Sequence, residues 1–300
     1  GINSLFISYL IFGIIGSIVS LVIIKKEIIN FKLCDIILKK KILKKILNFG
    51  FYILIYNIFN LFFGRLETIF LTIFSTIEEV GIYSAILPTI LAVSNLFSSL
   101  ILVLIPFVSE LWAKKKYVIL KKNIEEIYNY LFVFLIPVII SLMFYSDIIV
   151  TTLFTKKFTS GIIVFKIMAP AILLIVFSRI NVSILTGINN PKKIGKIMIL
   201  SFIVNLVGNL ILIPKFGVVG TAYSTIISFS FSSILLFSHI RKKIKIKTNP
   251  LKIIKLLIAY FSFFLTIQIS STFIELYPLV ESAIVISLSF IIYITIIFLF

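Results

Sequence analysis

Four ionised side chains stand inside long apolar runs of this sequence, and they are the residues most able to do chemistry. Arg65 and Glu67 lie two positions apart in one run, and Lys166 and Arg179 lie in another. If these runs cross a membrane, an arginine near the bilayer centre costs roughly 2.5–3.5 kcal/mol and needs a partner or water. Lys166 lies near the end of its run and can reach water with its long side chain. Arg65, Glu67 and Arg179 either line a functional cavity or form structural ion pairs between helices. The sequence alone does not decide between these two roles.

Uncharged polar side chains recur on single faces of the same runs when they are placed 100° apart as in a helix. Such stripes form where helices enclose a wet cavity, or where small residues and side-chain hydrogen bonds pack helices tightly. Asparagines are harder to explain by tight packing than serines or threonines are. The stripes comprise Asn57, Asn60, Gly64, Glu67 and Thr68; then Ser84, Asn95, Ser98 and Ser99; then Ser201, Asn205 and Asn209; and finally Thr221, Ser224, Thr225, Ser228 and Ser232.

The composition is that of a membrane protein. Of the 300 residues, 60% are hydrophobic and 13% are charged, and the mean hydropathy is +1.21. Soluble domains are about half apolar and carry about a quarter charged residues. The 29 Lys and Arg against 11 Asp and Glu give a net charge of +18. For an apolar chain this charge indicates anionic lipids at the membrane surface as partners, not nucleic acid.

The apolar runs predict an all-α polytopic membrane protein, because a spanning helix needs about 20 apolar residues and strands are far shorter. Nine transmembrane helices are expected. We expect a first helix with a basic linker over residues 1–46, a six-helix bundle over 47–240, and a basic linker with two further helices over 241–300. The predicted spans are Leu5–Ile24, Leu47–Ile77, Val80–Val108, Ile127–Tyr145, Ile162–Leu185, Ile197–Ile213, Val218–Ser238, Leu256–Phe273 and Ala283–Phe300.

The basic residues between these spans predict the topology. Residues 25–46, 109–126, 186–196 and 239–255 hold 23 Lys and Arg, whereas the alternate connections hold three. Short loops rich in Lys and Arg stay in the cytoplasm. The amino end is therefore expected outside and the carboxyl end inside. Within the first basic connection, Asn30–Leu47 is typical of an amphipathic helix in the inner headgroup layer, although a solvated linker stays an alternative.

Motifs for metal, nucleotide or disulfide chemistry are not found. Cys34 and His239 are the single cysteine and histidine, which excludes an internal disulfide and a His- or Cys-based metal site. The sequence has no P-loop. Glu78 and Glu79 form an adjacent acidic pair that we interpret as a solvated helix end. No cofactor, metal ion or catalytic residue is predicted.

Three motifs in the sequence resemble those of a known protein family. The first runs from Asn205 to Ala222 and reads NLVGNLILIPKFGVVGTA. The second, EVGIYS, begins at Glu79 after the helix with Arg65 and Glu67, and the third runs from Leu185 to Lys192. Together these motifs resemble those of the polysaccharide biosynthesis or O-antigen-type flippases of the multidrug/oligosaccharidyl-lipid/polysaccharide exporter superfamily, and the resemblance is best from Leu47 to Ser238. Pro214 cannot continue a helix, and Gly217 and Gly220 permit a tight turn with close helix approach.

The resemblance implies that the chain is the carboxyl-terminal part of a longer protein, with the second six-helix bundle of a flippase and flanking helices around a central cavity. It implies a transporter in the cytoplasmic membrane, not an enzyme, that moves a polyprenyl-pyrophosphate-linked oligosaccharide to the outer leaflet. Asparagines and serines would bind sugar hydroxyls, and Arg65 or Arg179 would pair with phosphate. Other polysaccharide-assembly proteins are possible partners. The candidate substrate-binding residues are Arg65, Glu67, Arg179, Asn57, Asn60, Asn95, Asn205 and Asn209.

Two other functions stay open at this stage. One is a drug exporter or peptidoglycan-precursor flippase of the same superfamily. The other is a polytopic glycosyltransferase or polysaccharide polymerase, which would be expected to carry catalytic residues in a substantial outer loop. The longest outer loop, Ser146–Gly161, holds only Asp147, Lys156 and Lys157 as ionised residues, which favours the flippase.

The topology predicts which positions an impermeant thiol reagent reaches. With Cys34 replaced by serine, single cysteines at positions 115 and 243 should stay unlabelled in intact cells, and a cysteine at position 275 should be labelled. The reason is the strict alternation of basic loops. Labelling from outside at 115 or 243 would contradict the topology, and labelling after permeabilisation is the control for accessibility.

Overall fold

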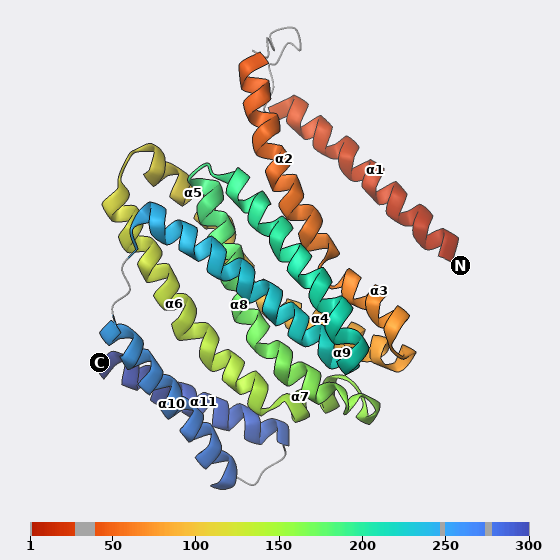
Figure 1. The fold of residues 1–300 in the computed structure, drawn as a ribbon, viewed down its shortest axis with the longest axis vertical. Helices are drawn as coiled ribbons and strands as arrows, with labels where there is room; N and C mark the ends of the chain where they lie inside the picture. Colours follow the sequence, from red (N-terminus) through yellow and green to blue (C-terminus); the bar gives the residue numbers. More distant parts are fainter. Residues whose placement is uncertain (1, 28–39, 247–249, 274–277, 300) are drawn as a thin grey trace. The chain divides into compact units, whose positions relative to one another are not determined.

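The computed structural model describes residues 2–27, 40–246, 250–273 and 278–299, and every regular element in these ranges is a helix (Figure 1). The chain forms two compact units, residues 1–48 and 49–300. The first unit contains α1 (Ile2–Glu27), an apolar helix. Residues 28–39, most of the expected amphipathic linker helix, lie outside the described residues. The predicted all-α fold is confirmed.

The second predicted span is broken in the middle, and here the expectation of one continuous helix was wrong. Helix α2 (Lys40–Phe62) ends before Gly64, and α3 (Arg65–Phe74) begins after it. Gly64 has φ +85°, a value that residues with a side chain rarely adopt. The polar stripe expected from Asn57 to Thr68 is therefore divided between two helices.

The third predicted span is also divided, into α4 (Ile77–Leu96) and α5 (Ser98–Ala113), which meet at Phe97. The start of α4 is fixed by a cap, because the Thr76 hydroxyl accepts a hydrogen bond from the Glu79 N–H. The side chains of Ser98 and Ser99 lie outside the described part of the chain. The break places Asn95 within the last turn of α4, next to the start of α5.

Helix α8 (Gly161–Gly187) is the centre of the second unit, as Figure 1 shows. It packs against α4, α5, α6 (Tyr117–Phe144), α7 (Ser146–Leu153) and α9 (Pro191–Ile244). A helix that is apolar on all sides is normally buried on all sides, and most residues of α8 are buried. A short 3₁₀ turn, η2 (Lys156–Phe158), precedes it.

Helix α9 is a hairpin of two arms that correspond to the sixth and seventh predicted spans. Gly217 interrupts it with non-helical backbone angles, φ 55° and ψ −133°. Asn209 and Ser224 would lie roughly 22 Å apart along a straight helix, yet the two side chains are hydrogen-bonded. The close approach at the turn requires Gly220, because a Cβ there would lie 2.6 Å from the carbonyl carbon of Leu212. The tight turn expected from the motif is confirmed.

The last two helices, α10 (Pro250–Phe273) and α11 (Pro278–Leu299), pack against each other around a second, smaller apolar core, to which Tyr145 at the end of α6 also belongs. Helix α10 also contacts α6. The Tyr293 hydroxyl on α11 donates a hydrogen bond to the backbone oxygen of Val133 on α6 at 2.8 Å. This pair of helices is thus joined to the bundle along α6.

The helices account for the nine predicted spans. Among the described residues, six helices are long and apolar enough to cross a membrane, and one of them is the α9 hairpin with two arms. Shorter apolar stretches in α1, α5 and α10 supply the remainder, with α5 continuing the span that α4 begins. The protein is therefore a multi-pass membrane protein. Its predicted orientation stays a prediction.

The hairpin turn gives a stability test. Replacing Gly217 by alanine should destabilise the protein by about 1–3 kcal/mol, because an L-residue is strained at this backbone conformation and the new methyl group would collide with the Glu79 carboxylate. Gly81→Ala is the matched control, since a Cβ at that position would have nothing within 4 Å of it and alanine favours a helix. Thermal unfolding of the complete protein in detergent measures both. Equal melting temperatures for the two variants would contradict the role of Gly217.

Candidate functional site

A cavity of about 680 Å³ opens between α2, α4, α5 and α8. Ligand pockets for small molecules commonly measure 300–1,000 Å³. Apolar side chains form most of its wall, and polar groups lie at a few places in it. The polar residues that line it are Tyr56, Asn57, Asn95, Arg179, Ser183 and Thr186, and the apolar ones are Ile53, Ile101, Leu102, Ile105 and Val182.

Arg179 is the charged residue of this cavity, and it is half-buried. Its Nη1 donates a hydrogen bond to Oδ1 of Asn95 at 2.9 Å. Arg179 lies on the central helix α8, and Asn95 lies at the end of α4 beside the break at Phe97. The bond therefore fixes the guanidinium between two helices. A guanidinium held beside apolar walls attracts anions more strongly than one in water, because the surroundings are less polar.

A second polar cluster is sealed inside the second unit, between α3 and the two arms of α9. Oε2 of Glu67 accepts a hydrogen bond from the Gly64 N–H at 2.6 Å, and its Oε1 accepts one from Asn205 Nδ2 at 3.0 Å. Asn209 Nδ2 donates to Oδ1 of Asn205 at 3.1 Å, and the Ser224 hydroxyl donates to Oδ1 of Asn209. Glu67, Asn205, Asn209 and Ser224 are all completely buried. These contacts join helices by side-chain hydrogen bonds.

The predicted site residues thus separate into different places. Asn57, Asn95 and Arg179 line the cavity, whereas Glu67, Asn205 and Asn209 belong to the sealed cluster. Asn60 is exposed, and its amide donates to the backbone oxygen of Tyr56. Arg65 is exposed at the start of α3, and none of the ion pairs among the described residues involves it. The expectation that Arg65 and Glu67 do not pair with each other agrees with this arrangement.

Glu79 has a structural role that the sequence interpretation missed. We interpreted it as a solvated end, but the side chain is half-buried and Oε2 accepts a hydrogen bond from the Val218 N–H at 2.8 Å. The Ser75 hydroxyl donates to the same oxygen. A carboxylate at this place satisfies the free N–H at the start of the second arm of α9. Glu79 and Val218 belong to two of the motifs that carried the family resemblance, so these motifs meet in space.

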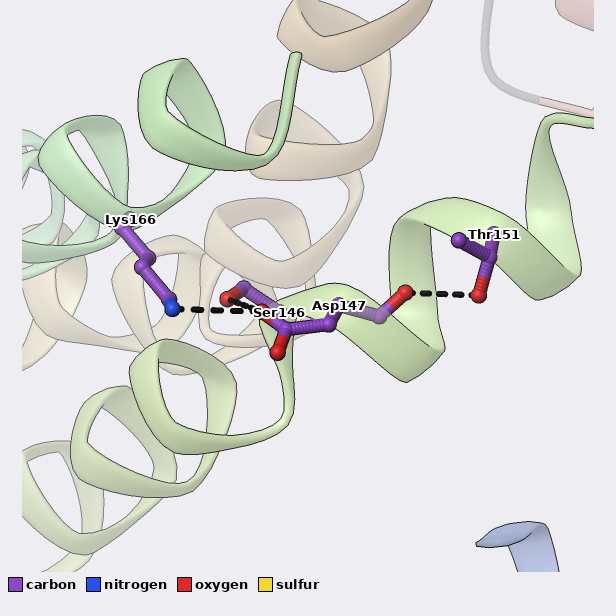
Figure 2. A network of polar contacts seen from close by, with 4 residues as sticks. All are labelled: Ser146, Asp147, Thr151 and Lys166. Carbon is purple, nitrogen blue, oxygen red and sulfur yellow. Dashed lines mark hydrogen bonds and ion pairs between the residues drawn. The ribbon is translucent and has the colours of Figure 1, made fainter. Parts of the chain in front are cut away.

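Lys166 has a specific partner at the start of α7. Its Nζ lies 3.1 Å from Oδ1 of Asp147, to which Ser146 also donates a hydrogen bond (Figure 2). Partial burial alone would raise the pKa of Asp147, but the hydrogen bonds from Lys166 and Ser146 outweigh it and hold the pKa below its ordinary value. Lys166 thus pairs with a carboxylate and does not line the Arg179 cavity. Both partners are partly exposed, so the pair contributes little to stability.

Comparisons of the sequence with known proteins support the family that the three motifs indicated. The sequence profile of the family described as polysaccharide biosynthesis protein matches residues 1–112. This stretch includes Glu67 and the motif at Glu79, whereas the motifs at Leu185 and Asn205 lie beyond it. The chain is also 26% identical over 205 residues to the probable low-salt glycan biosynthesis flippase Agl15 of Haloferax volcanii. The resemblance to the polysaccharide biosynthesis flippases is confirmed.

A second relative is the uncharacterized membrane protein MJ1068 of Methanocaldococcus jannaschii, which is 29% identical over 225 residues. The aligned parts cover 74% of this chain and 44% of that relative, and for Agl15 they cover 68% and 43%. The chain therefore spans less than half the length of the curated relatives that it matches.

The fold is that of a solved flippase. The structure of the lipid II flippase MurJ in an inward closed conformation matches with a TM-score of 0.62, over 95% of this chain and 60% of MurJ. The identity is 16%, so the likeness concerns the fold.

The sealed cluster predicts a stability effect for Glu67. Replacing Glu67 by alanine leaves the Asn205 amide and the Gly64 N–H without this acceptor, and each buried unsatisfied donor costs about 1–3 kcal/mol. Glu67→Gln keeps one acceptor oxygen and should cost less. Glu110→Ala is the control, because Glu110 forms an exposed pair with Lys114 that contributes little. Thermal unfolding of the complete protein in detergent ranks the three variants, and a Glu67→Ala melting temperature equal to that of Glu110→Ala would contradict this role.

Proposed function

We propose that this chain is part of a flippase that moves a polyprenyl-pyrophosphate-linked oligosaccharide across the cytoplasmic membrane for polysaccharide biosynthesis. The observation that carries the proposal is the cavity in which Arg179 is held by Asn95, between helices that belong to the membrane-spanning bundle. A carrier of such a lipid must shield a charged pyrophosphate and many hydroxyls from hydrocarbon. A cavity with one fixed cation and several neutral polar groups suits this task.

In this proposal Arg179 binds the pyrophosphate. A guanidinium presents a planar fork of N–H donors that matches two phosphate oxygens, and charge-assisted hydrogen bonds are roughly twice as strong as neutral ones. Asn57, Ser183 and Thr186 lie in the same cavity and bind sugar hydroxyls. Neutral hydrogen bonds are weaker than charged ones. Uncharged groups can therefore bind the sugars and still release them on the other side of the membrane.

The polyprenyl tail needs no polar group, and in this proposal it stays in the bilayer. Ile101, Leu102 and Ile105 of α5 line the cavity on one side, and Leu102 is largely exposed. An apolar exposed wall lets the tail stay in hydrocarbon while the headgroup enters. Anionic lipids and other polysaccharide-assembly proteins are further proposed partners, and the activity is transport without a catalytic residue.

The fold match gives weight to a peptidoglycan-precursor flippase as the second candidate. The matched structure is that of a lipid II flippase. In this proposal a peptidoglycan-precursor flippase would need the same pyrophosphate contact. It would differ from the oligosaccharide flippase in the sugars that Asn57, Ser183 and Thr186 bind. Transport assays with the two classes of lipid-linked sugar separate them.

Substitution of Arg179 in the complete protein tests the proposed contact. Arg179→Ala should reduce delivery of lipid-linked sugar to the outer leaflet at least about tenfold, since charged hydrogen bonds contribute roughly 1.5–3 kcal/mol. Arg179→Lys keeps the charge but loses the fork, so part of the activity should remain. Lys166→Ala is the matched control, because it removes a cation from the same helix outside the cavity.

Membrane abundance has to be measured for every variant. Normal transport by Arg179→Ala would refute the contact with the pyrophosphate. Loss of the Arg179→Ala protein from the membrane, with normal specific transport by the molecules that remain, would assign the bond to Asn95 a structural role instead.

A further inference from the structure

A backbone carbonyl without its helical partner belongs to a residue that lines the Arg179 cavity. In a regular helix the N–H of residue 106 donates to the carbonyl oxygen of residue 102. Residue 106 is a proline inside α5, and proline has no N–H, so the Leu102 carbonyl lacks this bond. Leu102 is largely exposed and lines the cavity. In the described part of the chain, no side chain donates to its carbonyl oxygen either.

Another proline shows how such a carbonyl is satisfied where protein surrounds it. Pro137 lies inside α6 and removes the helical partner of the Val133 carbonyl in the same way. There the Tyr293 hydroxyl donates to the Val133 oxygen at 2.8 Å. At membrane depth a backbone acceptor needs such a partner, unless it faces water or a ligand. Because Leu102 lines a cavity, the donor that satisfies its carbonyl would belong to a molecule inside the cavity.

Two hydrogen bonds show how α5 and α8 run past each other on this side of the cavity. Asn95, just before α5, bonds to Arg179 on α8. Further along α5, the Ser109 hydroxyl donates to the backbone oxygen of Gly187 at 3.2 Å. Residue numbers rise along both segments from the first contact to the second. The two helices therefore lie side by side and run in the same direction between these contacts.

Ser183 supplies a second polar group at a similar level of the cavity. Along the chain, Leu102 lies midway between the two contacts on its side, and Ser183 lies midway between them on α8. Ser183 is buried and lines the cavity, and no hydrogen bond in the described part of the chain involves its hydroxyl. A hydroxyl donates and accepts, whereas a carbonyl oxygen only accepts. A ligand that donates at least one hydrogen bond matches this pair.

We propose that the Leu102 carbonyl oxygen accepts a hydrogen bond from a sugar hydroxyl of the transported lipid, and thereby selects substrates in which that hydroxyl is free. The inference rests on the proposed function, because it assigns a further contact in the Arg179 cavity. Arg179 has only donors for the phosphate, whereas the carbonyl has only an acceptor for the sugar. A site built to bond a hydroxyl rejects an analogue without it, since the acceptor is then left unpaired. Pro106 is the positioning residue, because it keeps the carbonyl free.

Transport of deoxy analogues by the complete protein tests the proposal. Among lipid-linked sugars that each lack one hydroxyl, the unchanged protein should move one about three- to tenfold less well than the parent, as expected for one neutral hydrogen bond. Pro106→Ala returns an N–H to α5, so the Leu102 carbonyl pairs within the helix. This variant should no longer distinguish the parent from that analogue. Pro88→Ala is the matched control and should keep the distinction, because Pro88 lies inside α4 and the residue four positions before it does not line the cavity.

A backbone substitution separates the missing N–H from the shape of the proline ring. Lactic acid in place of Pro106 has the shape of alanine but carries an ester oxygen where alanine has its N–H, so the Leu102 carbonyl stays free. This variant should regain the distinction that Pro106→Ala loses.

Three outcomes would overturn the proposal. The unchanged protein could transport every deoxy analogue like the parent, or Pro106→Ala could keep the distinction between them. The lactic acid variant could also lose the distinction, and the effect would then come from the bend of α5. Normal transport by Arg179→Ala would refute the proposed function instead, so the two failures are distinguishable.

Discussion

The hydrogen bond between Asn205 and Glu67 joins α3 to the α9 hairpin, and the arrangement of the second unit depends on it. A polar atom in hydrocarbon costs free energy unless it has a hydrogen-bond partner. A carboxylate and two asparagines among apolar helices are therefore stable only when they bond to one another. Glu67, Asn205 and Asn209 do so in one continuous chain of contacts that ends at Ser224. Because this cluster is sealed, its polar groups are closed to a ligand, whereas those of the Arg179 cavity are open to one.

The two clusters use the same types of residue for different purposes. In the sealed cluster each amide and carboxylate has a protein partner, which stabilises the packing of helices and leaves no room for a substrate. Around Arg179 the residues Asn57 and Asn95 are exposed, so their amides can exchange partners. Helix α8 connects the two regions, because it packs on α9 along one side and carries Arg179 on another.

Composition and spacing were sufficient to predict the all-α fold, the number of spans and the hairpin turn, because bilayer thickness and the glycine requirement act locally. The sequence also predicted that Asn95 and Arg179 are functional candidates, but not that they bond to each other, since contacts between distant helices depend on packing. The stripe from Asn57 to Glu67 was misinterpreted as one face, because the break at Gly64 has no signal in hydropathy. Glu79 was missed for a similar reason: its partner is a backbone N–H 139 positions away, which no side-chain pattern reveals.

The α9 hairpin has a consequence for biogenesis. Either arm alone would expose unpaired polar side chains to lipid. Asn205 and Asn209 on the first arm find their hydrogen-bond partners largely on the second arm, at Ser224 and Ser228, and on α3. The reversal at Gly217 is so short that the arms lie side by side as soon as both are made. We therefore expect the two arms to enter the bilayer together, with their polar side chains facing each other, and α3, which is synthesised earlier, to form its hydrogen bond to Asn205 only after the hairpin is present.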